Sequence, residues 1–437
     1  MNWLHFFKTQ KKPQYPFGRG INASLSKDEE NLFNKSAEAF EKHDILGGYD
    51  FFLRSLIHYM DDISKENVVI KQENNKLNFI IYQGSAKITA EVTKKYLQAE
   101  VLMIKSANAN VALKRYILER NYQFTYAFYL SDGENIKLKI YSDNNTMSPQ
   151  KLFFPLRELA LNADFDKEHI KTEFPDINLE DIEHLEMIDN KELKIKYNYL
   201  HKWIDDLELK ISTLPASDTK GMHSFLYLNL LFKIDYLLLP KYRIYQKMSK
   251  KIQKYFSDET SGVEAKNEEL KKEILNLKKL SFEVFSSNFY NAKYTFSPFE
   301  KTPYEELSNF IDETLLKVRW YKNNRYPQII PTIYEYIAFY SLYNYGLNQV
   351  LKELLSLLVE VQNPNFFKEF GYKVLYDSKT QTLAKKEIIN RIDTIINSHK
   401  DRFKSIRAFG KELNFDTLNE FSNSFYIQIK HLNFEGA

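Results

Sequence analysis

The chain of 437 residues contains no cysteine. Disulfide bridges, thiolate catalysis and cysteine-based metal sites are therefore excluded together. Long apolar runs are also missing, since no segment reaches the roughly 18 consecutive apolar residues that a membrane span needs. The nearest run, residues 336–351, is uncharged but carries four tyrosines, and we predict a buried helix there.

Neither a targeting segment nor a strong charge imbalance is evident. The first residues, MNWLHFFKTQKK, place apolar residues before the charges, which is the reverse of a signal peptide. The net charge is only +3, from 61 basic and 58 acidic residues, so the chain as a whole presents no field that attracts polyanions. We expect a cytoplasmic protein without a transmembrane segment, for which nucleic acid is not the first partner to consider.

Catalytic signatures are absent as well. The chain contains no GxxxxGK[ST], GxGxxG, HExxH or GxSxG motif, and its nine histidines include no pair at helical metal-ligand spacing. The acidic connector, residues 175–190, could hold a hard cation, but the glycine and the alternation of a calcium loop are missing, which favours a solvated segment. We predict no enzyme activity, no cofactor and no metal. The alternative is an enzyme whose site combines Asp, Glu, His and Tyr residues of two domains.

Apolar and aromatic residues, in contrast, are plentiful. Hydrophobic residues make up 43% of the chain and aromatic residues 15%, with 33 Phe and 30 Tyr. This composition argues against disorder and is typical of large cores that end in wet interfaces. The length exceeds the roughly 250–300 residues at which single cores stop growing, so we expect two or more domains.

The N-terminal tail and linker, residues 1–25, combine aromatic with basic side chains. One interpretation is an anchor, through Trp3, Phe6 and Phe7, for a partner groove or for peripheral contact with an anionic membrane surface. The other is a tail that packs its aromatic side chains on its own domain, which is the more usual behaviour of so short a segment. The three residues stay candidates for partner binding.

Residues 26–174 are predicted to form an α+β domain. Helices are expected at four places: 26–42, from 49, from 108, and from the Ser148-Pro149 pair, which supplies an N-cap and an N1 proline. Alternating apolar residues between turn residues predict strands at 67–72, 76–82 and 97–105, with two more between 123 and 141. Residues 86–93 can continue the first hairpin. The order over residues 47–165 is α-β-β-β-α-β-β-α, an antiparallel sheet bracketed by helices.

The stretch from Ala99 to Tyr141 is central to this domain. Its helix turns Leu113 and Ile117 inward, and we predict that the basic side chains on the other side, Arg120 among them, are solvated. The flanking strands, at 97–105 and 123–141, are the expected partner surface. The candidate contact residues are Leu102, Ile104, Phe124, Tyr126 and Phe128.

This part of the sequence carries a resemblance. The order of elements, the phrase LKRYILERNYQFTYAFYLSDGENIKLKIYS and the closing SPQKLFFPLRELALNAD resemble the type III secretion chaperone-like domain of bacteria. The resemblance implies strands that pair in a dimer or adaptor, and a domain that binds an extended partner segment without performing chemistry. It is confined to the N-terminal part of the chain.

Beyond the connector, residues 191–437 are predicted to form an all-α helical array, because strand signals almost vanish there. Valine and leucine recur every seven residues between Val263 and Val284, which fits either a coiled-coil seam or, as we favour, a long bundle helix. The phrase TPYE, from Thr302, predicts a capping box with proline at the first helical position.

A second candidate site is the basic-aromatic segment KVRWYKNNRYP, residues 317–327. Arg319, Trp320 and Tyr321 could stack on and neutralise a single-stranded nucleic acid. A helix C-terminus gives the same pattern, because basic side chains complement the helix dipole, and we favour that interpretation. The sequence thus favours a non-enzymatic adaptor that binds a protein partner or itself, for example as a component of a secretion or other macromolecular assembly. Binding would use an open sheet edge or a groove for an amphipathic helix.

Overall fold

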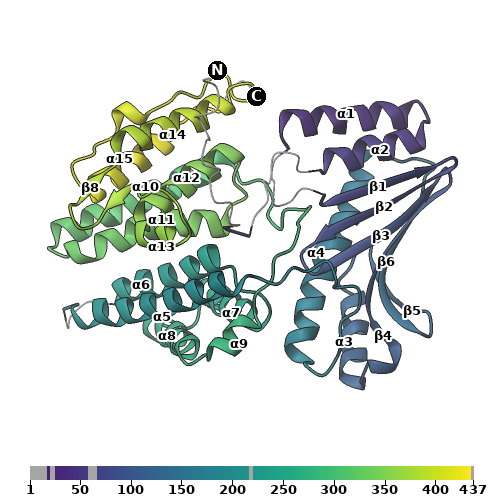
Figure 1. The fold of residues 1–437 in the computed structure, drawn as a ribbon, viewed down its shortest axis with the longest axis horizontal. Coiled ribbons are helices and arrows are strands. Elements are labelled where there is room, and N and C mark those ends of the chain that lie inside the picture. The colour runs from purple at the N-terminus through teal and green to yellow at the C-terminus, as the bar shows by residue number, and fades with distance from the viewer. Residues whose placement is uncertain (1–16, 20–24, 58–65, 216–219, 435–437) are drawn as a thin grey trace, which may run out of the picture.

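The computed structural model describes residues 17–19, 25–57, 66–215 and 220–434. A part with a β-sheet and a part built almost wholly of helices lie side by side (Figure 1). Both follow the predicted order along the chain, so the predicted fold class is confirmed: an α+β N-terminal part followed by a helical array.

The sheet has six antiparallel strands in the order β1-β2-β3-β4-β6-β5. Their bounds are β1 (Val68–Glu73), β2 (Lys76–Gln83), β3 (Ala86–Thr93), β4 (Tyr96–Lys105), β5 (Phe128–Ser131) and β6 (Asn135–Asp143). Residues 86–93 form β3, so the predicted order gains one strand before the central helix. Strands β1 to β4 make a meander, and β6 then pairs with β4.

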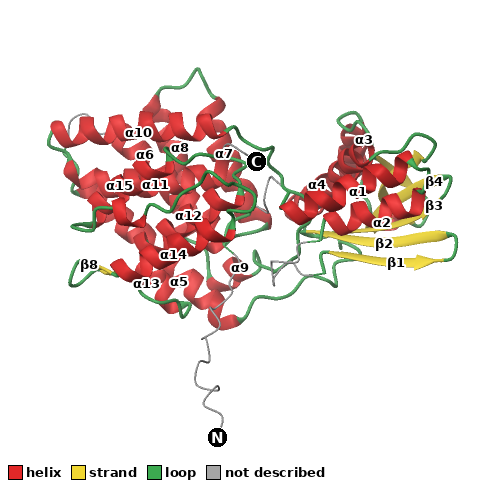
Figure 2. Ribbon diagram, turned by 90° about the horizontal axis from the view of Figure 1, so that it is seen from above, coloured by secondary structure: helices red, strands yellow, loops and turns green. Residues whose placement is uncertain are grey.

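Helices cover one face of this sheet. They are α1 (Lys27–Glu41), α2 (Ile45–Ser55), α3 (Val111–Asn121) and α4 (Pro149–Glu173). Helix α4 lies across β2, β3, β4 and β6, and Figure 2 shows α1, α2 and α4 on the same side of the strands. The alternation of Leu77, Phe79 and Ile81, all buried, places every second side chain of β2 against these helices.

The caps of two helices are those the sequence predicts. Ser26 and Glu29 form a reciprocal capping box at the start of α1. Ser148 caps α4, with Pro149 at its first helical position. Both signals lie within four residues of the helix start, which explains why they could be recognised without tertiary information.

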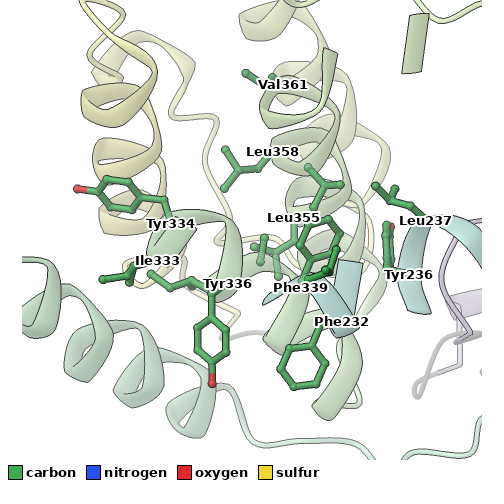
Figure 3. Close-up of a cluster of buried hydrophobic side chains, with 14 of the residues drawn as sticks. Phe232, Tyr236, Leu237, Ile333, Tyr334, Tyr336, Phe339, Leu355, Leu358 and Val361 are labelled. Atoms are coloured by element: carbon green, nitrogen blue, oxygen red, sulfur yellow. The ribbon is translucent and has the colours of Figure 1, made fainter. Parts of the chain in front are cut away.

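The helical part contains the remaining helices and one short hairpin. Their bounds are α5 (Asn190–Ser212), α6 (Lys220–Lys233), a π-helical turn (Ile234–Leu238), α7 (Tyr242–Ser257), α8 (Val263–Lys278), α9 (Phe282–Ser286), α10 (Tyr304–Asn323), α11 (Ile330–Asn344), α12 (Gln349–Gln362), α13 (Pro364–Glu369), β7 (Tyr376–Asp377), β8 (Thr382–Leu383), α14 (Lys385–Ser398) and α15 (Leu418–Ile429). Helix α11 is the centre, because it packs against α6, α10, α12 and α15. Figure 3 shows side chains of α6, α11 and α12, such as Phe232, Phe339 and Leu355, meeting in this core.

The structure confirms one local prediction in this part, the bundle helix, and contradicts another, the capping box at Thr302. The seven-residue repeat does not form a continuous seam, since α8 ends at Lys278 and Val284 lies in α9; α8 packs against α5, α6 and α7, which confirms the bundle helix. The prediction of a capping box at Thr302 is wrong. The residue at the N-cap of α10 is Pro303, and the Thr302 hydroxyl instead accepts the N–H of Gly346 at 2.9 Å. A long-range bond thus replaces the local one.

Residues 288–300, which we call the return loop, leave the helical part after α9 and run back to the sheet. Asn291 forms a bridge with Glu186 of the connector. The Gln83 side chain then accepts the N–H groups of Thr295 and Phe296, and the Phe296 ring is buried in the core of the sheet-bearing part. A segment that follows α9 in the chain therefore completes the core of the sheet-bearing part.

Candidate partner-binding site

The two edges of the sheet differ in whether their outward backbone groups are already bonded. At the β5 edge, the N–H of Tyr129 donates to Oδ1 of Asn121 at 2.6 Å, and Nδ2 of Asn121 donates to the Tyr129 carbonyl at 3.4 Å. Just before the strand, the N–H groups of residues 125–127 donate to the carboxylate of Glu158. Side chains of α3 and α4 therefore cap this edge, and a further strand would have to displace them.

Among the residues that the structure describes, none caps the β1 edge in this way. The N–H of Tyr82 donates to the carbonyl of Asn67. Because hydrogen-bonded pairs alternate along an antiparallel ladder, this bond shows which residues of β1 direct their backbone groups toward β2. The residues that turn their N–H and C=O groups away from the sheet are consequently Val68, Ile70 and Gln72. Within the part of the chain that the structure describes, the outward groups of Ile70 and Gln72 have no hydrogen-bond partner. This is the free margin of the sheet in Figure 2.

The face of the sheet opposite the helices is hollowed next to β1. The hollow has a volume of about 380 Å³ and is lined by residues of β1 to β4, including Val69, Ile80 and Glu100. Burial favours the neutral form of Glu100, but hydrogen bonds from Lys137 at 3.0 Å and from Lys139 outweigh it and hold its pKa below the ordinary value. The hollow therefore combines apolar surface with the paired carboxylate of Glu100 and with the charged side chain of Lys71.

Of the strands predicted to bind a partner, β4 and β6 lie in the interior of the sheet, and β5 is the capped edge. Strands β4 and β6 are paired on both sides and offer no free edge. Ile104 is buried, because the register shifts between Leu102 and Ile104 and turns this side chain into the core, whereas Leu102 is half-buried. Phe124 is half-buried too, and only Tyr126 and Phe128 are exposed. The free edge at β1 was missed, since nothing local distinguishes an edge strand from an inner one.

Arg120 of α3 is not solvated as predicted. Its Nε donates to Oδ1 of Asp166 at 2.9 Å, and the hydroxyls of Tyr116 and Tyr129 donate to the same carboxylate at 2.6 and 2.8 Å. Burial, together with the charge of Asp166, raises the pKa of Tyr116 well above its ordinary value. The prediction failed because Asp166 lies 46 residues away in sequence, and the cluster fastens α3 and β5 to α4.

The solvent side of α3 carries a second apolar stripe. Leu113 and Ile117 are buried against the sheet, as predicted. On the opposite side Val111, Leu118 and Tyr122 are 67%, 61% and 93% exposed. Steps of seven and four residues place these three within one narrow stripe of the helix. A helix that is apolar on both sides has one face without a partner within the described chain.

The basic-aromatic segment lies far from the sheet, at the end of α10 (Figure 1). Tyr321 is buried and packs against Phe225, whereas Trp320 is half-exposed and Arg319 is exposed. The three predicted residues therefore do not present a common stacking surface. The candidates of the N-terminal tail, Trp3, Phe6 and Phe7, lie outside the described residues.

A buried cluster of charged and phenolic groups joins α4 to the helical part. Asp164 accepts the N–H of Ser85 at 2.7 Å, and Glu168 accepts the hydroxyl of Tyr290 at 2.7 Å. Burial and then the charge of Glu168 raise the pKa of Asp164 to about 6, against the opposing effect of Lys241. Burial likewise raises the pKa of Tyr290 well above its ordinary value, with Glu168 adding to the effect. Such shifts accompany catalytic sites and structural junctions alike.

This junction is tightly packed around the β2–β3 turn. Gly84 adopts a left-handed φ of +54°, and a Cβ there would come within 2.2 Å of a carboxylate oxygen of Asp164. The N–H of Gly84 donates to the carbonyl of Lys293 in the return loop, and its carbonyl accepts from His184 of the connector at 3.1 Å. The turn therefore fastens three segments together, which favours a structural role for the buried charges.

Groups that could hold a metal ion, three or more His, Asp or Glu side chains together, do not occur among the residues that the structure describes. Of the helices described, none is both long and apolar enough to cross a membrane. No protein-family model matches the chain, and no curated protein matches it.

Proposed function

We propose that the protein is a non-enzymatic, cytoplasmic adaptor that binds an extended segment of a protein partner by adding it as a strand to β1. The observation that carries this proposal is the contrast between the two sheet edges. Asn121 and Glu158 cap β5, whereas Ile70 and Gln72 of β1 direct outward backbone groups that no described residue bonds. An added strand would satisfy those groups, since main-chain hydrogen bonds provide the affinity in this mode of recognition.

The hollow beside β1 supports the same mode of binding. Val69 of β1 and Ile80 of β2 line it, so alternate side chains of an added strand could turn toward this apolar surface. Because Glu100 is already paired with Lys137 and Lys139 and Lys71 also lines the hollow, the hollow favours a segment with apolar or acidic rather than basic side chains. The resemblance of the N-terminal part of the sequence to the type III secretion chaperone-like domain agrees with binding of an extended partner segment.

A backbone substitution at Gln72 tests the proposal. Gln72→Pro removes the outward N–H but no bond of the β1–β2 ladder, since the neighbouring residues carry that ladder. Gln72→Ala is the matched control, because it removes the same side chain and keeps the N–H. Partners captured from a native lysate by the wild-type chain would be identified by mass spectrometry and their affinities measured with purified components.

We expect Gln72→Pro to weaken binding roughly 3- to 10-fold and Gln72→Ala to leave it unchanged, in line with the loss of one intermolecular hydrogen bond. Equal affinity of the two variants would exclude strand addition at β1. If the wild-type chain captured no stoichiometric partner and did not associate with itself, the adaptor function would be contradicted as a whole.

We assign self-association to the outward apolar stripe of α3, which consists of Val111, Leu118 and Tyr122. Two copies of α3 packed antiparallel about a two-fold axis near Ile117 would place Leu118 at the centre of the contact. The same arrangement puts Arg115 of each copy opposite Glu119 of the other, which are exposed in the single chain. This reciprocal charge pairing favours a second copy over an unrelated helix as the partner of the stripe.

A further inference from the structure

A second cavity lies on the other side of the sheet-bearing part, where α1, the end of α2, the first turns of α4 and the return loop meet. Its volume is about 270 Å³. Five phenylalanines and two leucines form most of its walls: Leu25, Phe33, Leu56, Phe153, Phe154, Phe296 and Phe299. Enclosed apolar cavities with a few polar groups at the rim are the usual form of small-molecule sites, and this volume is near the lower end of their roughly 300–1,000 Å³ range.

A single arginine lies among the lining residues, and its orientation is fixed. Nε of Arg157 donates to the carbonyl of Ser297 at 3.1 Å, and Nη2 donates to the carbonyl of Pro298 at 3.4 Å. The third nitrogen, Nη1, lies 2.9 Å from the carboxylate of Glu300. The backbone of the return loop thus holds the guanidinium so that one nitrogen faces a carboxylate at the cavity.

The carboxylate that Arg157 now binds is weakly held. The Glu300 side chain is 81% exposed, and an ion pair with so exposed a partner contributes little to stability, because water screens it. A carboxylate that also buries an apolar tail would gain the same contact and the burial of its tail besides. Glu300 therefore occupies a position at the rim from which a better carboxylate ligand could displace it.

We propose that this cavity binds a small monocarboxylate with an aliphatic tail, whose carboxylate replaces Glu300 on Arg157 and whose tail enters the aromatic cavity. The other acid that lines the cavity, Glu29, accepts the N–H of Ser26 at 2.6 Å in the capping box of α1. The carboxylate of the ligand is therefore directed to the Arg157 end. The size of the cavity favours one unbranched tail over a larger ring system. The site is independent of the β1 edge and of the adaptor function.

Bound ligand would contact three segments at once. Phe33 comes from α1, Phe153 from α4 and Phe296 from the return loop, so the ligand would bridge elements that are far apart in sequence. Its binding should therefore raise the thermal unfolding midpoint of the full chain, because ligands that bind only the folded state stabilise it by mass action.

Calorimetric titration of the full-length chain with decanoate and with decanol tests the proposal. Decanoate should bind at one site, and Arg157→Ala should weaken it roughly 10- to 100-fold while leaving decanol unchanged, because only the carboxylate uses the guanidinium. Glu300→Ala should strengthen decanoate binding up to about 5-fold, since it removes the competing carboxylate. Glu305→Ala, an exposed acid just beyond the return loop, is the matched control and should change nothing.

The gain expected for Glu300→Ala keeps the test valid if Arg157→Ala loosens the return loop, because damage to the fold would weaken binding and not strengthen it. Circular dichroism would confirm that each variant is folded. No binding of decanoate to the wild-type chain, or equal affinities for decanoate and decanol in all variants, would overturn the proposal. So would an increase in affinity for Glu305→Ala equal to that for Glu300→Ala, which would indicate non-specific charge effects.

Discussion

At the scale of single residues, the buried carboxyl groups of α4 determine how its two faces are fixed. Asp166 receives bonds from an arginine and two tyrosines, so its charge is compensated. Asp164, two residues earlier, faces the helical part and has Glu168 as a neighbour, which adds to the cost of charging it. Two aspartates separated by one residue thus have opposite electrostatic surroundings.

We predict from this contrast that Asp164 makes folding depend on pH. Its pKa is about 6 in the folded chain, against about 3.9 for an unfolded one. The folded state therefore keeps a proton between pH 4 and 6 that the unfolded state has already released. The stability that Asp164 contributes is fully present below pH 4 and is lost as the pH rises through 6, by on the order of 2–3 kcal/mol.

Asp164→Asn should remove this dependence. The free energy of unfolding, measured by urea titration at pH 4, 5, 6 and 7, should fall less steeply for the variant than for the wild type over this range. Asp176→Asn, which changes an exposed aspartate of the connector, is the control and should follow the wild type. Parallel curves for all three proteins would show that Asp164 is not the titrating group.

At the scale of elements, α3 and the two edge strands decide which surfaces are available. Asn121, the last residue of α3, bonds both backbone groups of Tyr129, so the helix that covers the sheet also closes its β5 edge. The same helix exposes a second apolar stripe. The same element thus closes one sheet edge and exposes the stripe that we propose for self-association, while β1 remains the edge that we propose for strand addition.

We expect Leu118→Asp to abolish self-association through α3. A charge introduced at the centre of an apolar contact has no counter-ion there, which should weaken the dimer roughly 100-fold or more. Light scattering coupled to gel filtration would measure the mass at micromolar concentration. Leu209→Asp, the same substitution at an exposed leucine of α5, is the control and should keep the wild-type mass. A monomeric wild-type chain, or loss of association in both variants, would contradict the assignment.

At the scale of the whole molecule, the return loop makes the two parts depend on each other. Phe296 follows α9 of the helical part, yet its ring lies 5.6 Å from Phe153 in the core of the sheet-bearing part. The buried cluster around Asp164 adds contacts between α4 and α7. Folding of the N-terminal part should therefore require residues that lie more than a hundred positions further along the chain.

Phe296→Ala should destabilise the sheet-bearing part by about 3–5 kcal/mol, the usual cost of removing a buried phenylalanine ring. Because the ring also anchors the return loop, calorimetry should separate the heat unfolding of the variant into two transitions, with the lower one belonging to the sheet. Phe299→Ala, a half-buried ring of the same loop, should have a smaller effect. A single transition at the wild-type temperature would show that Phe296 does not link the two parts.

What the sequence by itself determined is local. Alternating apolar residues predict the strands, seven-residue spacing predicts the α8 bundle helix, and Ser26 and Ser148 predict helix starts, because each signal depends on residues within a turn or two. The fold class follows from the order of these elements. For α3 the sequence predicted the inward side alone. The spacing that places Leu113 and Ile117 inside says nothing about where Arg120 finds its counter-ion.

Only the tertiary structure decided which strands and side chains lie at the surface. Which strand lies at an edge depends on the pairing order of all six strands, so β1 could not be distinguished from β4 or β6 by its own residues. The bonds from Arg120 to Asp166, from Gly346 to Thr302 and from Phe296 to Gln83 each span more than forty residues. Hydrogen bonds and apolar contacts act over a few ångströms in space whatever the separation along the chain, and only the folded chain brings these groups within that range.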